Sequence, residues 1–343
     1  MMDEDVSALA GELGCESFVP LPRDVSPRRY YRGFQKKKNR SVILMRYSLS
    51  SESSAELRQF IHISKWLAQK GIKTPAVYHG DLERNFALLE DLGATSFGRA
   101  LKEGGDRVEL YTLATEVLRR LRESETPGSL PPFESSRIRR NVRQFVEYAL
   151  PVCRGEKAQG PLLEDYLRVW DRIEKSLPPC PRGFLHGDYH LENLMVMENA
   201  QGLSRCALID FQDALEGPLP YDLVNLLEDA RVDVPENLRE KLIALYCQGM
   251  NREEGETVRL WYRVLGTQFH SRVIGLFIML AAEQGRDEYL IHLQRLKNYI
   301  EKGVQHPALA PLKEWLTKEG IDFSPVKDLN GPEIRKLFQM IKS

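Results

Sequence analysis

The sequence predicts an α+β protein of two lobes, in which a small antiparallel-sheet lobe is followed by a large, mainly helical lobe. Three observations support this prediction. The first ninety or so residues contain strand-like apolar segments around one helical stretch. Beyond about Gly93 the apolar periodicity is that of helices. The length of 343 residues leaves room for two cores, since domains commonly have about 150 residues.

The small lobe is expected to hold four strands and one helix, in the order strand, strand, helix, strand, strand. Two apolar and aromatic segments joined by the polar turn KKKNR indicate a hairpin, and a second pair of strand-like segments follows. Between the pairs, Leu57, Ile61 and Leu67 share one helical face, and Gly71 closes the stretch. The expected strands cover residues 28–35, 41–48, 74–80 and 85–91, and the expected helix covers residues 55–69.

The large lobe is expected to be helical except between Phe184 and Phe211. There the apolar pieces NLMVM and CALIDF flank the turn ENAQGLSR, which indicates another hairpin. Near the C-terminus, Pro332 suits a first helical position and an apolar stripe follows it, so we expect a docked helix over residues 331–343. The other expected helices cover residues 107–123, 134–150, 161–176, 222–230, 236–248, 255–283, 286–301 and 308–318.

Charge and composition exclude several classes of function. The chain has 48 Lys and Arg against 49 Asp and Glu, whereas a general nucleic-acid binder would need a positive field. Five scattered cysteines without a C-x-x-C pair fit neither a disulfide framework nor a zinc knuckle. The N-terminus lacks the features of a signal peptide, and the longest nearly apolar run, Val273 to Ala282, is about half a bilayer span. We therefore expect a cytoplasmic protein that binds neither nucleic acid nor membrane, with no obligate protein partner evident.

The stretch HGDYHLENLMVM, followed by ALIDFQDA, carries the chemistry of the chain. Phosphoryl transfer needs a carboxylate that orients the attacking hydroxyl and accepts its proton, together with oxygen ligands that hold Mg²⁺ against the nucleotide phosphates. In a protein-kinase-type site, an Asp and an Asn five positions later share one loop, and a second Asp follows a hairpin. Asp188, Asn193 and Asp210 have this spacing. The neutral oxygen of Asn193 and the anionic oxygens of Asp210 suit Mg²⁺.

These motifs, H-G-D-x-H-x-x-N and I-D-F, resemble the aminoglycoside phosphotransferase/choline kinase superfamily, which has a protein-kinase-like fold. Longer segments look like one bacterial branch, the kinases that phosphorylate the anomeric hydroxyl of N-acetylmuramate and N-acetylglucosamine in cell-wall recycling. The resemblance covers most of residues 20 to 320, and the segments that carry it are DVSPRRYYR, FALLEDLG, FLHGDYHLENLMV, ALIDFQDALEGPLPYDLVNLLEDARVDVP and LGTQFHSRVIGLFIMLAAEQGRDEYL. It implies a sugar 1-kinase of peptidoglycan recycling that uses ATP and Mg²⁺ to phosphorylate an amino sugar.

The resemblance also implies roles for the residues of the catalytic loop. Asp188 would be the catalytic base and His186 a structural member of its loop. Asn193 and Asp210 would be the magnesium ligands. His190 would either orient the loop or contact the sugar, and Gln212 and Asp213, which follow the metal-binding Asp, would either contact substrate or make local hydrogen bonds.

For the nucleotide, the resemblance implies a binding lobe over residues 1–92 and a catalytic and substrate lobe over residues 93–343, with a hinge at about 89–93. Arg46 falls where the family places a phosphate-gripping Lys, and the turn DVSPRRY replaces a glycine-rich one. The expected acidic partner of Arg46 on the following helix is not evident, because Gln59 and Phe60 lie near its place. The expected nucleotide contacts are Ser26, Arg28, Arg46, Glu90 and Leu92.

Three other interpretations remain open at this point. An aminoglycoside- or choline-type phosphotransferase of the same superfamily would share the catalytic loop. In HGDYH, His186, Asp188 and His190 alternate and could ligate zinc in a metallohydrolase, although the remaining histidines show no ligand-like clustering. A non-catalytic pseudokinase that serves as a binding module would fit the weak nucleotide-lobe motifs, but it would not require the intact Asp188.

Overall fold

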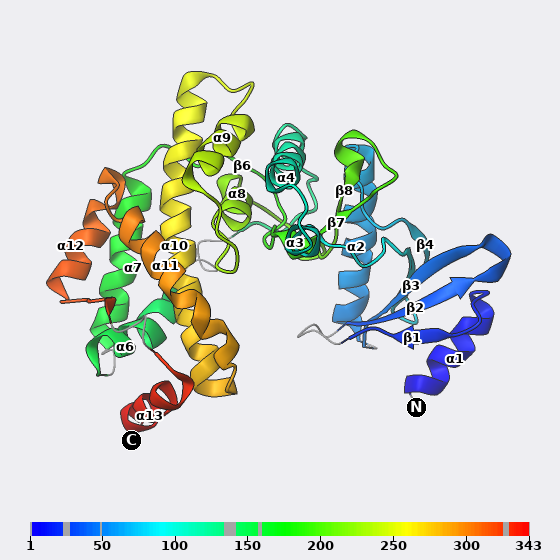
Figure 1. The fold of residues 1–343 in the computed structure, drawn as a ribbon, viewed down its shortest axis with the longest axis horizontal. Helices are drawn as coiled ribbons and strands as arrows, with labels where there is room; N and C mark the ends of the chain where they lie inside the picture. Colours follow the sequence, from blue (N-terminus) through cyan, green and yellow to red (C-terminus); the bar gives the residue numbers. More distant parts are fainter. Residues whose placement is uncertain are drawn as a thin grey trace. The chain divides into compact units, whose positions relative to one another are not determined.

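The computed structural model describes residues 2–22, 28–48, 50–133, 142–156, 160–324 and 329–342, and it confirms the α+β prediction (Figure 1). The chain forms two compact units, each of which is built from two separate stretches of sequence. The first unit contains residues 1–130 and 186–214, and the second contains residues 131–185 and 215–343. The expected division into lobes at residue 92 stays a prediction, since these units group the segments in another way.

The first unit is built on a five-stranded antiparallel sheet. The four expected strands are present, and the order across the sheet is β1-β2-β3-β5-β4. Sequence reasoning missed the short edge strand β1 and the N-terminal helix α1. The elements are α1 (Met2–Glu12), β1 (Phe18–Pro20), β2 (Arg29–Gln35), β3 (Arg40–Arg46), α2 (Ser51–Gln69), β4 (Val77–Asp81) and β5 (Phe86–Glu90). Helix α2 begins earlier than expected because Ser50 caps it, its Oγ accepting from the Ser53 N–H at 3.1 Å.

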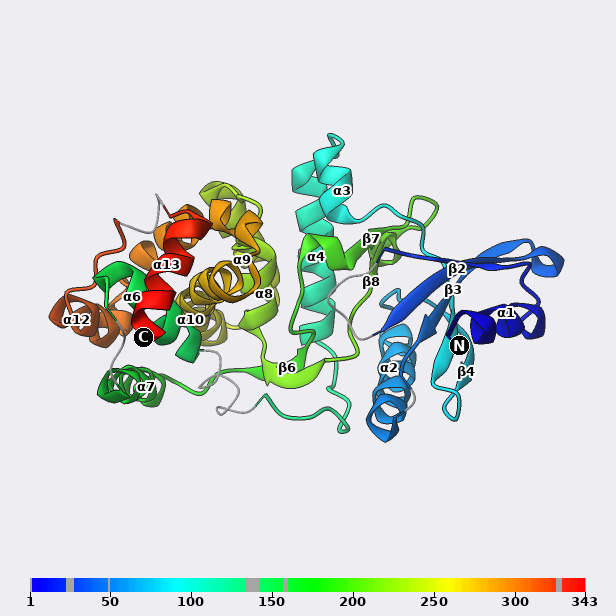
Figure 2. The same ribbon diagram turned by 90° about the horizontal axis from the view of Figure 1, so that it is seen from below.

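The two faces of this sheet have different neighbours, because side chains alternate along each strand. One face carries Tyr31, Leu44 and Phe86, which pack with Val6 and Leu9 of α1, and Figure 2 shows α1 lying along the sheet. The opposite face carries the residues of the other parity, which line a cavity; these are Tyr30, Arg32, Ile43, Met45 and Leu89. The sheet therefore uses one face for the core and the other for the cavity.

The remaining elements of the first unit carry the loop and the hairpin that contain Asp188, Asn193 and Asp210. The expected second hairpin is confirmed, since β7 and β8 pair antiparallel. It is tied to its surroundings by single bridges, Lys73 with Ala207 and Ser96 with Met195. The elements are α3 (Phe97–Lys102), α4 (Arg107–Arg122), the 3₁₀ turn Leu191–Asn193, β7 (Leu194–Val196), the 3₁₀ turn Gly202–Arg205 and β8 (Cys206–Leu208).

The second unit is helical apart from one short strand pair, β6 with β9. Strand β9 was missed because Gly217 and Pro218 interrupt its apolar pattern. The expected helix 286–301 begins as a 3₁₀ segment, and the first part of the expected helix 134–150 lies outside the described residues. The elements are the π-turn Phe145–Ala149, α6 (Leu150–Arg154), α7 (Gly160–Lys175), β6 (Arg182–Leu185), β9 (Leu215–Pro218), α8 (Pro220–Leu227), α9 (Glu236–Tyr246), α10 (Arg252–Gln284), the 3₁₀ segments Asp287–His292 and Pro307–Leu309, α11 (Leu293–Gly303), α12 (Ala310–Lys318) and α13 (Gly331–Lys342).

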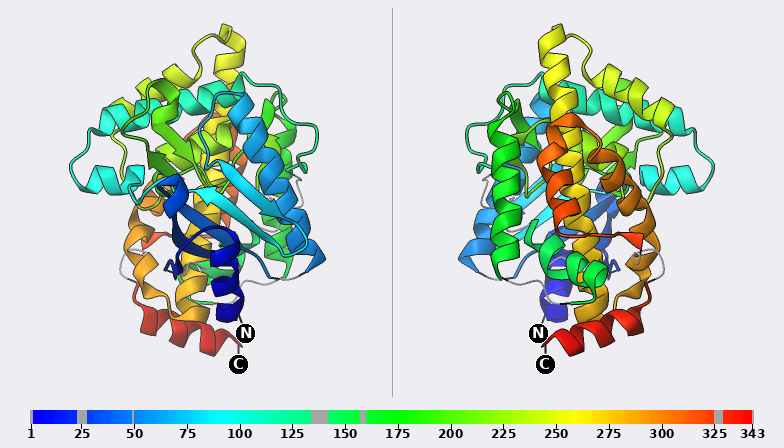
Figure 3. Two further views of the ribbon diagram at one scale, coloured as in Figure 1. Left: turned by 90° about the vertical axis from the view of Figure 1, so that its right-hand side faces the viewer. Right: turned by 90° about the vertical axis from the view of Figure 1, so that its left-hand side faces the viewer.

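Helix α10 forms the centre of this unit, and Figure 3 shows it beside α7 and α11. Asn251 and Glu254 form a capping box at its start, and Gly285 ends it in a left-handed conformation. Its apolar stretch is long enough to cross a bilayer, but 72% of that stretch is buried inside the unit. The C-terminal helix α13 docks as expected, because Ile334 is buried and Arg335 donates to both carboxylate oxygens of Asp287.

Candidate active site

The loop that begins at His186 is fixed by its own hydrogen bonds. His186 is 1% exposed, and its Nε2 lies 3.0 Å from the Ile209 carbonyl oxygen. Its Nδ1 accepts from the Asp188 N–H at 3.4 Å, so the neutral ring carries its proton on Nε2 and donates to Ile209. Burial lowers the pKa of His186, which favours that neutral form. Gly187 has φ 86°, a left-handed conformation that glycine adopts without strain, and the chain turns there towards Asp188.

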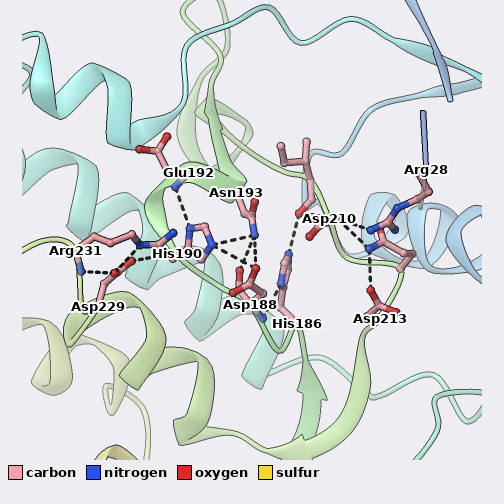
Figure 4. A network of polar contacts seen from close by, with 12 residues as sticks. Arg28, His186, Asp188, His190, Glu192, Asn193, Asp210, Asp213, Asp229 and Arg231 are labelled. Carbon is pink, nitrogen blue, oxygen red and sulfur yellow. Dashed lines mark hydrogen bonds and ion pairs between the residues drawn. The ribbon is translucent and has the colours of Figure 1, made fainter. Parts of the chain in front are cut away.

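Asp188, His190 and Asn193 form a polar cluster at the end of this loop (Figure 4). The Asn193 Nδ2 donates to the Asp188 backbone oxygen at 2.9 Å and to its Oδ2 at 3.1 Å. The His190 Nε2 lies 3.3 Å from the same Oδ2, while its Nδ1 accepts from the Glu192 N–H at 3.2 Å. Because Nδ1 accepts, a neutral His190 carries its proton on Nε2 and donates to Asp188. Two groups therefore hold one carboxylate oxygen of Asp188, whose side chain is 61% exposed.

A second cluster surrounds Asp210, directly after the hairpin (Figure 4). The Arg28 Nη2 donates to Asp210 Oδ1 at 3.1 Å, and Gln212 Nε2 donates to the same oxygen at 2.9 Å. Gln212 also donates to Asp213 Oδ2 at 3.0 Å, so it holds the two carboxylates together. Asp210 has φ 61°, which is uncommon for a residue other than glycine and is often found at functional sites.

The two clusters meet at a cavity of about 470 Å³ that lies within the first unit. Asn193 and Asp210 both line it, together with Arg28 and Gln212. The rest of its wall is mostly apolar and comes from the sheet, α2, the hinge segment and the hairpin; the apolar lining residues are Leu21, Ile43, Met45, Phe60, Pro75, Leu89, Leu92, Met195, Ile209 and Phe211. A cavity of this size, with an apolar wall and polar groups that include Asn193 and Asp210, suits a small molecule that has an apolar part and a charged part.

The segment after β5 is braced from both sides. The Arg32 guanidinium donates to both carboxylate oxygens of Asp91, at 2.7 and 3.1 Å, and the Ser41 hydroxyl donates to Oδ2 at 2.6 Å. These bonds, with one from the Gly93 N–H, outweigh burial and lower the pKa of Asp91. The Glu90 carboxylate accepts from Lys73 Nζ and from the Ala76 N–H.

The structure brings most of the expected site residues together. The catalytic-loop residues form the two clusters just described, and Arg28, Glu90, Leu92 and Gln212 line the cavity. The Glu90 carboxylate is engaged by Lys73 and Ala76, and the nucleotide contact expected at Glu90 stays a prediction. His190 binds the loop itself, which fits the first of its two expected roles. Asp213 is exposed and is not among the lining residues, so its contact with substrate stays a prediction.

Two expected nucleotide contacts are not brought to this cavity. Arg46 pairs with Phe86 in register and has the parity of the face that α1 covers, so it is absent from the cavity lining. Its contact with phosphate stays a prediction, whereas Arg28, of the other parity, reaches Asp210. Ser26 lies outside the described residues.

Sequence reasoning missed several residues of the site. At the place on α2 where an acidic partner of Arg46 is expected, Phe60 stacks on Phe211, with ring centroids 4.9 Å apart and an interplanar angle of 13°. The pair of Arg32 and Asp91 joins residues 59 positions apart, and no local spacing could reveal it. Glu192 was passed over, although its place between His190 and Asn193 was a usable signal.

The geometry gives no support to the zinc alternative. Both ring nitrogens of His186 are used within the fold, one by Ile209 and the other by Asp188. Within the described ranges, no group of three or more His, Cys, Asp or Glu side chains is arranged to hold a metal ion. A metallohydrolase site would need such a group.

Comparison with known proteins places this chain among phosphotransferases. A model of the phosphotransferase enzyme family matches residues 17–259. The N-acetylmuramate/N-acetylglucosamine kinase of Pseudomonas aeruginosa is 31% identical over 313 residues, which are 89% of each chain. The protein of the same name from Caulobacter vibrioides is 27% identical over 88% of this chain and 82% of its own. The fold is similar to that of a choline kinase from Streptococcus pneumoniae, with a TM-score of 0.54 and 14% identity over 89% of this chain and 98% of that one.

Proposed function

The chain belongs to the phosphotransferase enzyme family, and we propose that it transfers the γ-phosphate of ATP, with Mg²⁺, to the anomeric hydroxyl of N-acetylmuramate or N-acetylglucosamine. The observation that carries this proposal is that Asn193, whose amide donates to Asp188, and Asp210 line one cavity of nucleotide size. The names of the curated relatives support the choice of acceptor. The reaction would take place in the cytoplasm, where ATP is available, and would serve the recycling of cell-wall sugars.

The apolar part of the cavity would receive the adenine ring. Ile43, Met45 and Leu89 form one wall on the sheet, and Met195 and Ile209 of the hairpin also line the space. The backbone of residues 90–92 borders the cavity and would meet the edge of the base. The pair of Arg32 and Asp91 holds this backbone to β2, so the contact would be preorganised.

The part of the cavity beside Arg28, Asn193 and Asp210, its polar end, would receive the phosphates and the metal. The donor set fits Mg²⁺, because the Asn193 amide and the Asp210 carboxylate offer hard oxygen ligands from two neighbouring segments. Since Asn193 Nδ2 donates to Asp188, its amide oxygen is the atom left for a cation. When bound, Mg²⁺ would neutralise phosphate charge. The guanidinium of Arg28, which already lies against Asp210, would contact a phosphate oxygen from the side of the sheet.

Asp188 would orient the acceptor hydroxyl and take its proton. His190 and Asn193 both hold Oδ2, which fixes the plane of the carboxylate, and the side chain is 61% exposed. Such positioned acid–base groups contribute about 10²- to 10⁴-fold to the rate of a reaction. The anomeric hydroxyl is a favourable acceptor for this base, because the ring oxygen makes it more acidic than the other sugar hydroxyls.

An acceptor panel tests this proposal. Formation of ADP is measured with ATP, Mg²⁺ and one acceptor at a time: N-acetylmuramate, N-acetylglucosamine, choline or kanamycin. We expect turnover with the two N-acetylated sugars and none with choline or kanamycin. Turnover only with choline or kanamycin would contradict the proposed acceptor, and no turnover with any of the four would contradict the proposed reaction.

A further inference from the structure

Glu192 connects the loop of Asp188 to helix α3. The Ser96 hydroxyl donates to Glu192 Oε2 at 2.5 Å, and Lys102 Nζ donates to Oε1 at 3.1 Å. Ser96 is 7% exposed and also caps α3, where its Oγ accepts from the Arg99 N–H at 3.0 Å. The carboxylate of Glu192 is thus held by both ends of one short helix.

The space around this carboxylate is closely fitted. Gly98 of α3 is buried, and a Cβ atom added there would lie 2.4 Å from Glu192 Oε1 and 2.6 Å from its Cδ. Such distances are far below van der Waals contact, so a larger residue at position 98 would displace the carboxylate. Glycine is costly inside a helix, and its presence here keeps the room that Glu192 occupies.

The other end of Glu192 acts on the catalytic loop. Its backbone N–H donates to His190 Nδ1 at 3.2 Å, and this bond places the imidazole proton on Nε2, which faces Asp188 Oδ2 at 3.3 Å. Two backbone contacts hold the next segment in the same way: Ser96 bridges to Met195, and the Val196 N–H donates to the Thr95 oxygen at 2.9 Å. Helix α3 and the two residues that precede it therefore contact the chain on both sides of Asn193.

We infer that Glu192 is a positioning residue: its anchorage on α3 sets the ring of His190 and, through that ring, the direction of the Asp188 carboxylate. Glu192 itself touches neither nucleotide nor acceptor in this account. The inference rests on the proposed function, because it assigns Asp188 the task of orienting the acceptor hydroxyl. A shift of about 1 Å in a catalytic group can cost on the order of 10²-fold in rate.

The first test removes the anchor. Glu192→Ala should lower kcat by about tenfold to a hundredfold, while the KM for ATP stays close to that of the wild type. Glu192→Gln keeps an oxygen for the Ser96 hydroxyl, so its kcat should lie between those of the wild type and Glu192→Ala. Each kcat is divided by the fraction of protein that binds ATP in titration calorimetry, so that a loss of folded protein does not count as a loss of catalysis. Glu103→Gln, at the residue directly after the same helix and paired with Arg99, is the matched control and should leave kcat unchanged.

The second test uses the steric contact as a double-mutant cycle. Gly98→Ala should lower kcat in the wild-type background, because its methyl group displaces the Glu192 carboxylate. In the Glu192→Ala background the same substitution should have no further effect, since the obstructing carboxylate is gone. Gly11→Ala is the control for the substitution itself, because Gly11 is helical and has no atom within 4 Å of the added Cβ.

The outcomes separate this inference from the proposed function. Strictly additive effects of Gly98→Ala and Glu192→Ala, or a normal kcat for Glu192→Ala, would overturn the inference alone, provided that Asp188→Ala is inactive in the same assay. Normal turnover of Asp188→Ala would overturn the proposed role of Asp188, and the inference would fall with it. A loss that vanishes after division by the ATP-binding fraction would also overturn the inference, because it would show that Glu192 only stabilises the fold.

Discussion

At the scale of single residues, two neighbouring side chains hold one carboxylate oxygen of Asp188. His190 and Asn193 both contact Oδ2, and His186 Nδ1 accepts a hydrogen bond from the backbone N–H of Asp188. The neutral state of His186 matters here, since a protonated ring could not accept that N–H. The loop thus uses two histidines to fix a carboxylate whose side chain remains mostly exposed.

Asp210→Asn should raise the Mg²⁺ concentration needed for half-maximal activity by about tenfold or more, the change expected from a loss of roughly 1.4 kcal/mol of binding free energy. Asparagine tolerates the left-handed backbone at this position, so the substitution removes charge without adding strain. A magnesium titration of activity measures the change. Glu109→Gln, which removes an exposed carboxylate paired with Arg205, serves as the control. An unshifted titration for Asp210→Asn would contradict metal binding at this residue.

The two arginines at the ends of β2 and β3 should differ in their effects. Arg28→Met should raise the KM for ATP by about tenfold, because a charge-assisted bond contributes roughly 1.5–3 kcal/mol. Arg46→Met should leave that KM near the wild-type value and instead lower the unfolding temperature, since Arg46 is buried and has the parity of the face that α1 covers. Steady-state kinetics at varied ATP concentrations measures both KM values, and thermal unfolding followed by circular dichroism measures the unfolding temperature. The reverse ranking would contradict this expectation and support the phosphate contact predicted from the sequence for Arg46.

At the scale of elements, the sequence predicts those helices and strands whose own residues carry a clear apolar periodicity or turn signal. Strands β2 to β5, helix α10 and the hairpin of β7 and β8 follow from the apolar periodicity and turn residues of their own segments. Three of the missed elements are short: β1 has three residues, α3 has six, and β9 has four and contains Gly217 and Pro218. The missed helix α1 is longer, with 11 residues. Their place depends on neighbours distant in sequence.

The candidate site shows the same division between local and distant information. Asp188, Asn193 and Asp210 were found because their spacing in the sequence is itself the signal. The link of Arg28 to Asp210 spans 182 positions and depends on the side of the strand to which Arg28 belongs. Arg46 has the parity of the opposite face of the sheet and is absent from the cavity lining. Its position at the end of a strand does not by itself reveal which face its side chain occupies.

The packing of α10 gives a prediction for one element. Gly275→Ala should destabilise the protein by about 1–3 kcal/mol, because the added Cβ would lie 2.2 Å from the backbone oxygen of Gln144. Gly255→Ala in the same helix meets its nearest atom only at 3.9 Å, and it should be neutral or stabilising by up to about 1 kcal/mol. Urea unfolding monitored by tryptophan fluorescence measures both. Equal effects of the two substitutions would contradict the close approach at Gly275.

At the scale of the whole molecule, the balanced charges of the chain are arranged locally. The net charge of the chain is only −1, but opposite charges lie together at the polar end of the cavity, where Arg28 contacts Asp210. A bound cation and phosphate would each find an opposite charge at this end. The charge balance that argues against nucleic acid is therefore compatible with a strongly polar site.

Stability should decline as the pH falls below about 6.5, the ordinary pKa of histidine. His270 is 1% exposed, and its Nε2 lies 3.1 Å from the backbone oxygen of Glu228. Burial lowers the pKa of His270, and Arg239 lowers it further, whereas the carboxylates of Glu228 and Asp229 raise it by less. Below pH 6.5 the unfolded chain therefore binds a proton that the folded chain does not bind until a lower pH. The slope is about 1.4 kcal/mol per pH unit for each such group.

Urea unfolding at pH 7.5, 6.5 and 5.5 tests this dependence. The free energy of unfolding should change little between pH 7.5 and 6.5 and should fall towards pH 5.5. In His270→Gln the fall should be smaller by the contribution of one histidine. An identical fall in the wild type and the variant would show that His270 does not carry it.

The central claim is that Asp188 directs a phosphate onto the anomeric hydroxyl of an N-acetylated amino sugar. The most direct measurement is ³¹P NMR of the product that forms from N-acetylmuramate, ATP and Mg²⁺ with the wild type and with Asp188→Asn. We expect the wild type to form a sugar phosphate whose phosphorus couples to the single anomeric proton, and its rate of formation to be reduced by about 10²-fold or more in Asp188→Asn. A phosphorus coupled to two protons, as in a 6-phosphate, or an undiminished rate in Asp188→Asn would contradict it.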